Sequence, residues 1–156
     1  MNTNIGISDA NSKAVALELN KLLANEVVLY TKTRNYHWNI ESPSFMEVHK
    51  LLEGQYGELE EMIDSVAERI RSIGHYAEGR LVDFLKLTSL LEPDNTTNQK
   101  VQLKNLLDDH ETIIRELRAL ITKFADEYKD LGSSDFVTGL IGKHEKTAWI
   151  LRSYNK

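Results

Sequence analysis

The chain has 156 residues, 41% of them apolar, and a formal charge of −5 at neutral pH. This size predicts one domain over residues 1–156 with a substantial core, and the negative charge disfavours a general polyanion-binding surface. The absence of cysteine excludes a disulfide framework, a thiolate metal site and a cysteine nucleophile. Because residues 1–13 lack a signal-peptide pattern and no apolar run approaches the length of a membrane span, we expect a cytoplasmic protein.

Helical periodicity dominates the first half of the chain, where apolar residues recur three or four positions apart. After a flexible tail over residues 1–11, the pattern predicts a first helix from about residue 12 to Asn39. Its apolar stripe is wide enough to face a core. The proline at position 43 breaks the pattern, and a second helix is predicted from Ser44 to Ile73, where Gly74 stops it.

The second half of the chain repeats this arrangement. A third helix is predicted over about residues 97–128, with nearly unbroken 3-4 spacing of its apolar positions. The run Gly132-Ser133-Ser134-Asp135 is expected to end it and to cap a fourth helix that reaches about Tyr154.

Connection lengths predict the topology. The first and second helices are joined by a handful of residues, as are the third and fourth, so each pair should form an antiparallel hairpin. The middle connection, about residues 74–96, contains a short amphipathic segment over 81–91. A connection of this length can travel the roughly 45 Å of a thirty-residue helix, so the second and third helices can run parallel. The expected fold is an all-α, ferritin-like four-helix bundle with a short extra helix in its long crossover.

Five side chains of metal-ligand type fall on the first two helices: His37, His49, Glu53, Asp64 and Glu68. Imidazole nitrogens mixed with carboxylate oxygens suit iron, manganese or zinc. His49/Glu53 and Asp64/Glu68 are i,i+4 pairs, but the fifteen steps from His49 to Asp64 span roughly 22 Å of helix. One ion cannot bridge that distance. If all five serve one centre, two antiparallel copies of the second helix must meet across a two-fold axis.

The residues that carry this pattern resemble the Dps family, the ferritin-like miniferritins named as DNA-binding proteins of starved cells. The similarity covers nearly the whole chain and is strongest from Tyr36 to Gly74, where the spacing H-x11-H-x14-D-x3-E is matched without a gap. The matching stretches are His37-Trp38-Asn39, then Phe45 and His49, then Asp64-Ser65-Val66-Ala67-Glu68-Arg69-Ile70.

The resemblance implies a ferroxidase and iron-storage protein that protects against oxidative stress. In the family, the two histidines come from one subunit and the aspartate and glutamate from its two-fold mate, while the acid at the Glu53 position helps to hold a second iron. A hollow shell of twelve subunits then oxidises Fe(II), preferentially with hydrogen peroxide, and deposits a ferric mineral inside. Carboxylates stabilise Fe(III), and two irons that give one electron each reduce peroxide without releasing a hydroxyl radical.

Trp38 has two open interpretations. Beside a ligand, it can stack at the site and intercept a stray oxidising equivalent, and it is therefore counted with the catalytic residues. Alternatively, it is a core or interface aromatic.

His110, on the apolar stripe of the third helix, is interpreted as a core histidine. The chain contains no Glu-x-x-His and no complete H-E-x-x-H, which disfavours an intrasubunit di-iron centre and a zincin.

Three acids near the junction of the third and fourth helices, Asp126, Asp130 and Asp135, match the position of the family's negative three-fold pore, which would guide Fe(II) inward. The alternative is that Asp135 caps the fourth helix and that the others are solvated.

DNA binding is expected to be weak or absent, since residues 1–12 contain no Lys or Arg. The competing hypothesis is a nucleoid-binding structural protein with a vestigial metal site. A bundle that mediates only oligomerisation would leave the ligand spacing unexplained.

Overall fold

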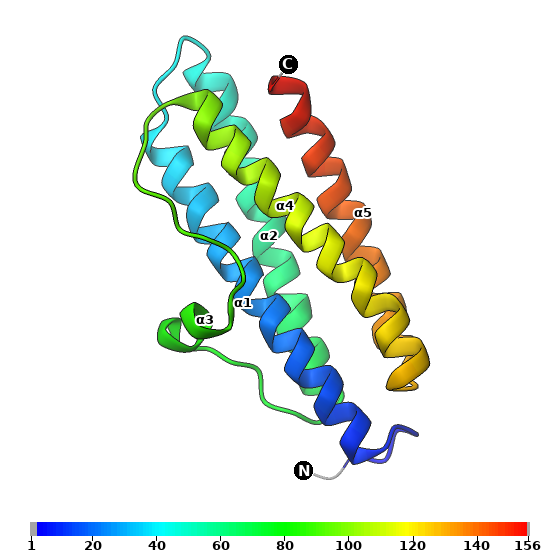
Figure 1. The fold of residues 1–156 in the computed structure, drawn as a ribbon. Helices are drawn as coiled ribbons and strands as arrows, with labels where there is room; N and C mark the ends of the chain where they lie inside the picture. Colours follow the sequence, from blue (N-terminus) through cyan, green and yellow to red (C-terminus); the bar gives the residue numbers. More distant parts are fainter. Residues whose placement is uncertain (1–2, 156) are drawn as a thin grey trace.

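The computed structural model describes residues 3–155, and its elements are helices (Figure 1). Four long helices form the bundle: α1 (Asp9–Asn39), α2 (Phe45–Ser72), α4 (Gln99–Thr122) and α5 (Leu131–Tyr154). The short helix α3 (Leu81–Leu87) lies in the crossover, and a π-helical turn, η1 (Lys123–Glu127), continues α4. No helix within residues 3–155 is long and apolar enough to cross a membrane.

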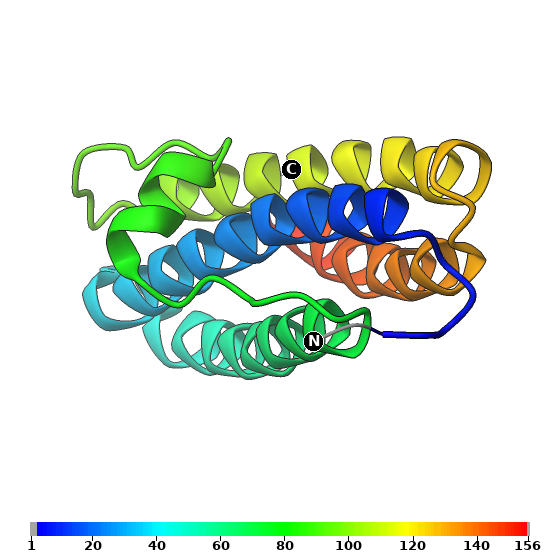
Figure 2. The same ribbon diagram turned by 90° about the horizontal axis from the view of Figure 1, so that it is seen from below.

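The predicted topology is confirmed. α1 packs most extensively against α2, and α4 against α5, and each pair is an antiparallel hairpin (Figure 1). The crossover returns along the side of the bundle, so that α2 and α4 run parallel (Figures 1 and 2). This is the ferritin-like arrangement of two hairpins and one long connection.

The core lies between the four long helices, and the apolar stripes of the sequence face it. On α1 the side chains of Val15, Leu19, Leu22 and Leu23 are buried, as the 3-4 spacing predicts. Apolar side chains of the other long helices, such as Leu52, Leu106 and Leu151, are buried among them. Burial of this stripe fixes which face of α1 and α2 points outward.

The helix ends differ from the predicted ones at two places. Residues 9–11, expected in a flexible tail, form the first turn of α1, because the Ser8 hydroxyl accepts a hydrogen bond from the Asn11 N–H at 3.2 Å. The predicted cap over residues 132–135 is wrong, since α5 begins at Leu131 and those residues lie in its first turns. Lys129, with φ of 55°, reverses the chain just before the true cap.

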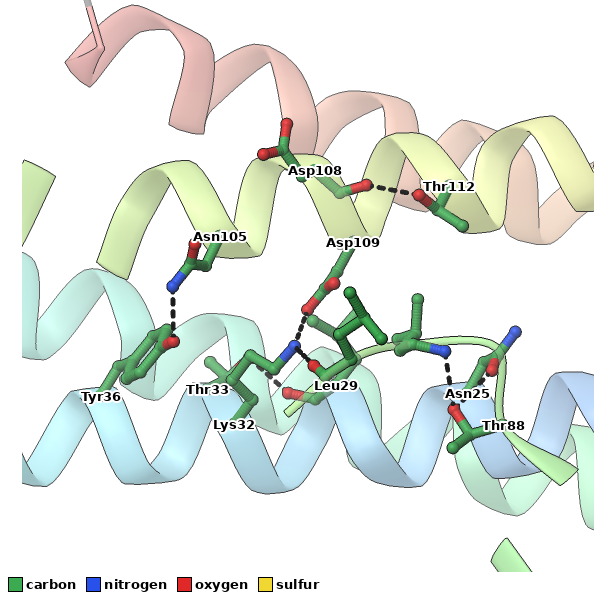
Figure 3. Close-up of polar contacts among 12 residues, drawn as sticks. Asn25, Leu29, Lys32, Thr33, Tyr36, Thr88, Asn105, Asp108, Asp109 and Thr112 are labelled. Atoms are coloured by element: carbon green, nitrogen blue, oxygen red, sulfur yellow. Dashed lines mark hydrogen bonds and ion pairs between the residues drawn. The ribbon is translucent and has the colours of Figure 1, made fainter. Parts of the chain in front are cut away.

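Buried polar contacts hold the crossover against α1 and α4 (Figure 3). The Lys32 ammonium donates to Asp109 Oδ2 at 2.6 Å and to the Leu91 carbonyl at 2.5 Å. The Thr88 hydroxyl donates to Asn25 Oδ1 at 2.7 Å, directly after α3. Burial raises the pKa of the Asp109 carboxyl, although the Lys32 ammonium opposes this effect. Because Thr88 is extended and bonded to α1, the short helix ends at residue 87 instead of continuing to 91.

Candidate metal centre

His37 and His49 face each other where the α1–α2 hairpin closes. Their rings stack with centroids 3.7 Å apart and an angle of 15° between the planes. His37 Nδ1 lies 2.7 Å from the His49 carbonyl oxygen, and His49 Nδ1 lies 2.8 Å from the His37 carbonyl oxygen. A carbonyl oxygen only accepts, so both Nδ1 atoms carry the proton and donate it. In each neutral ring the Nε2 atom keeps its lone pair, which is the form that binds a metal.

Aromatic side chains fix the orientation of this histidine pair. The Tyr56 ring meets the His37 ring edge-on, with centroids 5.2 Å apart at 82°. The Phe45 ring stacks on His49 with centroids 5.0 Å apart. His37 itself is buried, with 7% of its surface exposed. The pair is therefore held in place before any ligand arrives.

The three acids of the pattern, Glu53, Asp64 and Glu68, are exposed on α2. Because α2 is unbroken from Phe45 to Ser72, the rise of a regular helix separates His49 from Asp64 by roughly 22 Å. Among residues 3–155, no three His, Cys, Asp or Glu side chains gather closely enough in one chain to hold a metal ion. A centre that uses all five residues therefore needs a second copy of the chain.

Trp38 does not stack on either histidine. It is 62% exposed, so its interpretation as a core aromatic is wrong, while its roles at an interface and in intercepting an oxidising equivalent stay predictions. The Arg34 guanidinium lies 5.3 Å from its ring and 4.8 Å from the Tyr56 ring. Arg34 also donates to the Tyr30 hydroxyl at 2.7 Å. Tyr56 was not among the predicted site residues, although its position seven residues after His49 places it two turns further on the same face.

The three acids of the predicted pore have different environments. Asp130 is 3% exposed: it accepts from the Ser133 N–H at 2.9 Å and from the Arg69 guanidinium at 3.3 Å. This carboxylate caps α5, which corrects the assignment of the cap to Asp135 and the alternative that Asp130 is solvated. The role of Asp130 in a pore stays a prediction. Asp126 and Asp135 are exposed, and their role in guiding Fe(II) stays a prediction.

Comparison with known proteins identifies the family. The family model of the ferritin-like domain matches residues 16–156. A "DNA protection during starvation protein 2" of Bacillus anthracis is 32% identical over 143 residues, which cover 92% of this chain and 97% of the relative. The chain belongs to the Dps family.

Further similarities agree with this assignment to Dps. A low temperature-induced protein of Nostoc sp. is 41% identical over 152 residues, which cover 97% of this chain and 85% of that protein. The crystal structure of the Dps protein of Vibrio cholerae O1 superposes with a TM-score of 0.93 and 32% identity, covering 100% of this chain and 98% of that one. The Vibrio cholerae protein is described as a member of a broad superfamily of ferritin-like diiron-carboxylate proteins. Both the predicted Dps family and the predicted ferritin-like fold are confirmed.

Proposed function

We propose that this Dps protein is a ferroxidase and iron-storage protein. It oxidises Fe(II) with hydrogen peroxide at centres shared between two subunits and stores the ferric product inside a hollow shell of twelve chains. The observation that supports the proposal is the histidine pair, whose reciprocal Nδ1 bonds to backbone carbonyls leave the Nε2 lone pair of each ring available to a metal. Family membership and the description of a structural neighbour as a diiron-carboxylate protein support iron as the metal.

Each ligand has a defined part in the proposed centre. His37 and His49 of one subunit supply nitrogen donors, and Asp64 and Glu68 of a two-fold mate supply carboxylates. Glu53, one turn beyond His49 on α2, would help to hold a second iron. Carboxylate oxygens favour the higher charge of Fe(III) and so promote oxidation.

The proposed reaction balances with two irons. Two Fe(II) ions give up one electron each, and one hydrogen peroxide takes both electrons and two protons to become two water molecules. A site that pairs the irons avoids the one-electron step that would release a hydroxyl radical. The protection against oxidative stress that we propose is therefore chemical, since iron and peroxide are consumed together.

The alternative function, protection by coating DNA, has less support. Twelve chains of −5 each would carry a formal charge of about −60, which repels a phosphate backbone at physiological salt. Residues 1–12 contain Asp9 but no Lys or Arg, so they offer no basic side chain to a phosphate backbone. The names of relatives that mention DNA protection do not by themselves require a direct contact with DNA.

Anaerobic loading with Fe(II) followed by addition of peroxide tests the proposal. We expect His37→Ala and Asp64→Ala to lose most of the rapid formation of Fe(III), which absorbance records. Glu58→Ala is the matched control, because Glu58 is an exposed acid on α2 that points roughly 120° away from Asp64 around the helix axis. Unchanged oxidation rates in both ligand variants would refute the assigned centre.

A further inference from the structure

Three buried polar side chains form a continuous chain through the core of the bundle. Glu26 of α1 and His144 of α5 are fully buried, and His110 of α4 is 1% exposed. His144 Nε2 lies 2.8 Å from Glu26 Oε1, and its Nδ1 lies 2.9 Å from His110 Nδ1. The chain joins three helices whose remaining core contacts are mostly apolar.

The two ends of this chain are unsatisfied. Glu26 Oε2 and His110 Nε2 are buried and have no hydrogen-bond partner within residues 3–155. Because His144 uses both of its ring nitrogens inside the chain, it presents no free lone pair, and these residues do not form a metal cluster. Because these residues are buried and bind no metal, their surroundings determine how many protons they hold.

The geometry limits how many protons the chain can hold. Each of its two contacts needs one shared proton, because a carboxylate oxygen and a bare imidazole nitrogen both only accept. With those two protons the chain comprises a carboxylate and two neutral rings. One more proton, at either end, makes it neutral, and a further proton leaves a net positive charge in the core, where nothing solvates it.

Within residues 3–155, the other buried Lys, Arg, Asp and Glu side chains are Lys32, Asp109 and Asp130, and each is paired with a group outside the chain of Glu26, His144 and His110. On α4 the neighbours of His110 face other partners: Asp109 pairs with Lys32, and Glu111 with Arg152. The buried side chains of α2 are apolar except for the Gln55 amide, so none of them carries a charge. Burial lowers the pKa of His110 well below its ordinary value, and the positive charge that His144 can carry lowers it further.

We propose that the Glu26–His144–His110 chain is an acid-sensitive lock of the bundle: it joins α1, α4 and α5 at neutral pH and releases them on acidification. In the unfolded polypeptide, Glu26, His110 and His144 each take up a proton independently as the pH falls. The folded bundle accepts fewer, so acid favours the open state. Glu26 lies eleven residues before His37 on α1, about 16 Å along the helix, so the lock is separate from the proposed iron centre.

Urea unfolding at fixed protein concentration, from pH 7.5 to 5.0, tests the lock. Below about pH 6.5 we expect the apparent unfolding constant to rise about tenfold per pH unit for each extra proton that the unfolded chain binds. In His110→Leu the unfolded polypeptide should bind one extra proton fewer. The apparent unfolding constant of this variant should therefore rise less steeply as the pH falls. His75→Gln, a histidine in the loop after α2, should keep the parent dependence. An unchanged pH dependence in His110→Leu would overturn the proposal.

A second measurement needs no variant and so holds even if His110→Leu does not fold. The imidazole C2 hydrogen is exchanged for deuterium in the folded parent protein, which is then digested. Mass spectrometry of the peptides reports the titration of each histidine separately. We expect His110 to titrate well below pH 6.5. A His110 midpoint at or above the ordinary value, with exchange as fast as that of a free histidine, would also overturn the lock.

Discussion

Mixed assembly of two inactive variants tests whether two subunits share the proposed centre. His37→Ala removes a nitrogen ligand, and Asp64→Ala removes a carboxylate that lies about 22 Å along α2 from the second nitrogen ligand, His49. In the proposed two-fold pair, each centre would take its histidines from one chain and its acids from the other. Neither variant can therefore build an intact centre alone, but one of each can.

The expected recovery follows from counting centres. A mixed pair has one centre with both changes and one centre with neither. When equal amounts assemble at random, half of the pairs are mixed, and each has one intact centre out of two, so about one quarter of all centres are restored. In the matched control, His37→Ala assembled with Glu58→Ala should leave about one half intact, because only the histidine side of each centre varies.

The assay is the peroxide-dependent oxidation of Fe(II) by shells refolded together from the two variants. A mixture of the same variants assembled separately gives the baseline, since its subunits are never paired. If co-assembled shells show no more activity than this baseline while the control mixture reaches its half value, the centre lies within one subunit and the reasoning from α2 is wrong.

Three further predictions follow from other parts of the molecule. Asp130→Ala removes the cap of α5 and should lower the free energy of unfolding by about 1–2 kcal/mol in urea titrations, whereas Asp135→Ala should change it little. The pKa of Asp109 lies above its ordinary value of 3.8, so its folded form binds a proton more readily than the unfolded form. The contribution of this carboxyl to stability should fall as the pH rises from about 3.8 through the raised pKa, and Asp109→Asn should remove that dependence. Metal-free shells should not retard DNA in a low-salt gel shift, and stoichiometric retardation would contradict the charge argument.

The topology could be predicted from the sequence because it depends on the spacing of apolar residues within each helix and on the lengths of the connections. The 3-4 spacing along residues 12–39 and 97–122 marks which face is buried, and connection lengths alone distinguish the hairpins from the crossover. The separation of the two halves of the candidate centre was accessible for the same reason: a regular helix has a fixed rise per residue, and α2 is regular from end to end.

The position of the α5 cap was not accessible, because residues 130–135 offer several side chains that can cap a helix. Asp130, Ser133, Ser134 and Asp135 are all suitable by type. The left-handed backbone at Lys129 decides between them, and the Arg69 guanidinium from α2 then pairs with the chosen carboxylate. That pairing joins residues 61 positions apart, which no local pattern encodes.

The buried chain in the core was missed for a similar reason. His110 was correctly interpreted as a core histidine, but its partner His144 lies on another helix, and Glu26 is 118 positions from His144. Periodicity places each of these side chains on a core-facing stripe but does not say that the three meet at one level of the bundle. Their contact depends on the register of three helices, which only packing sets.

The two halves of the proposed iron centre differ in how firmly the subunit holds them. The His37 and His49 rings are fixed by two hydrogen bonds and by stacking, so binding a metal costs them little conformational entropy. Asp64 and Glu68 are exposed on α2 and keep the rotamer freedom of surface side chains. A rigid pair of nitrogens with mobile carboxylates suits a metal that changes charge during the reaction, because the carboxylates can adjust as Fe(II) becomes Fe(III). We therefore expect loss of a histidine to abolish binding of the first iron, and loss of an acid to affect oxidation more than binding.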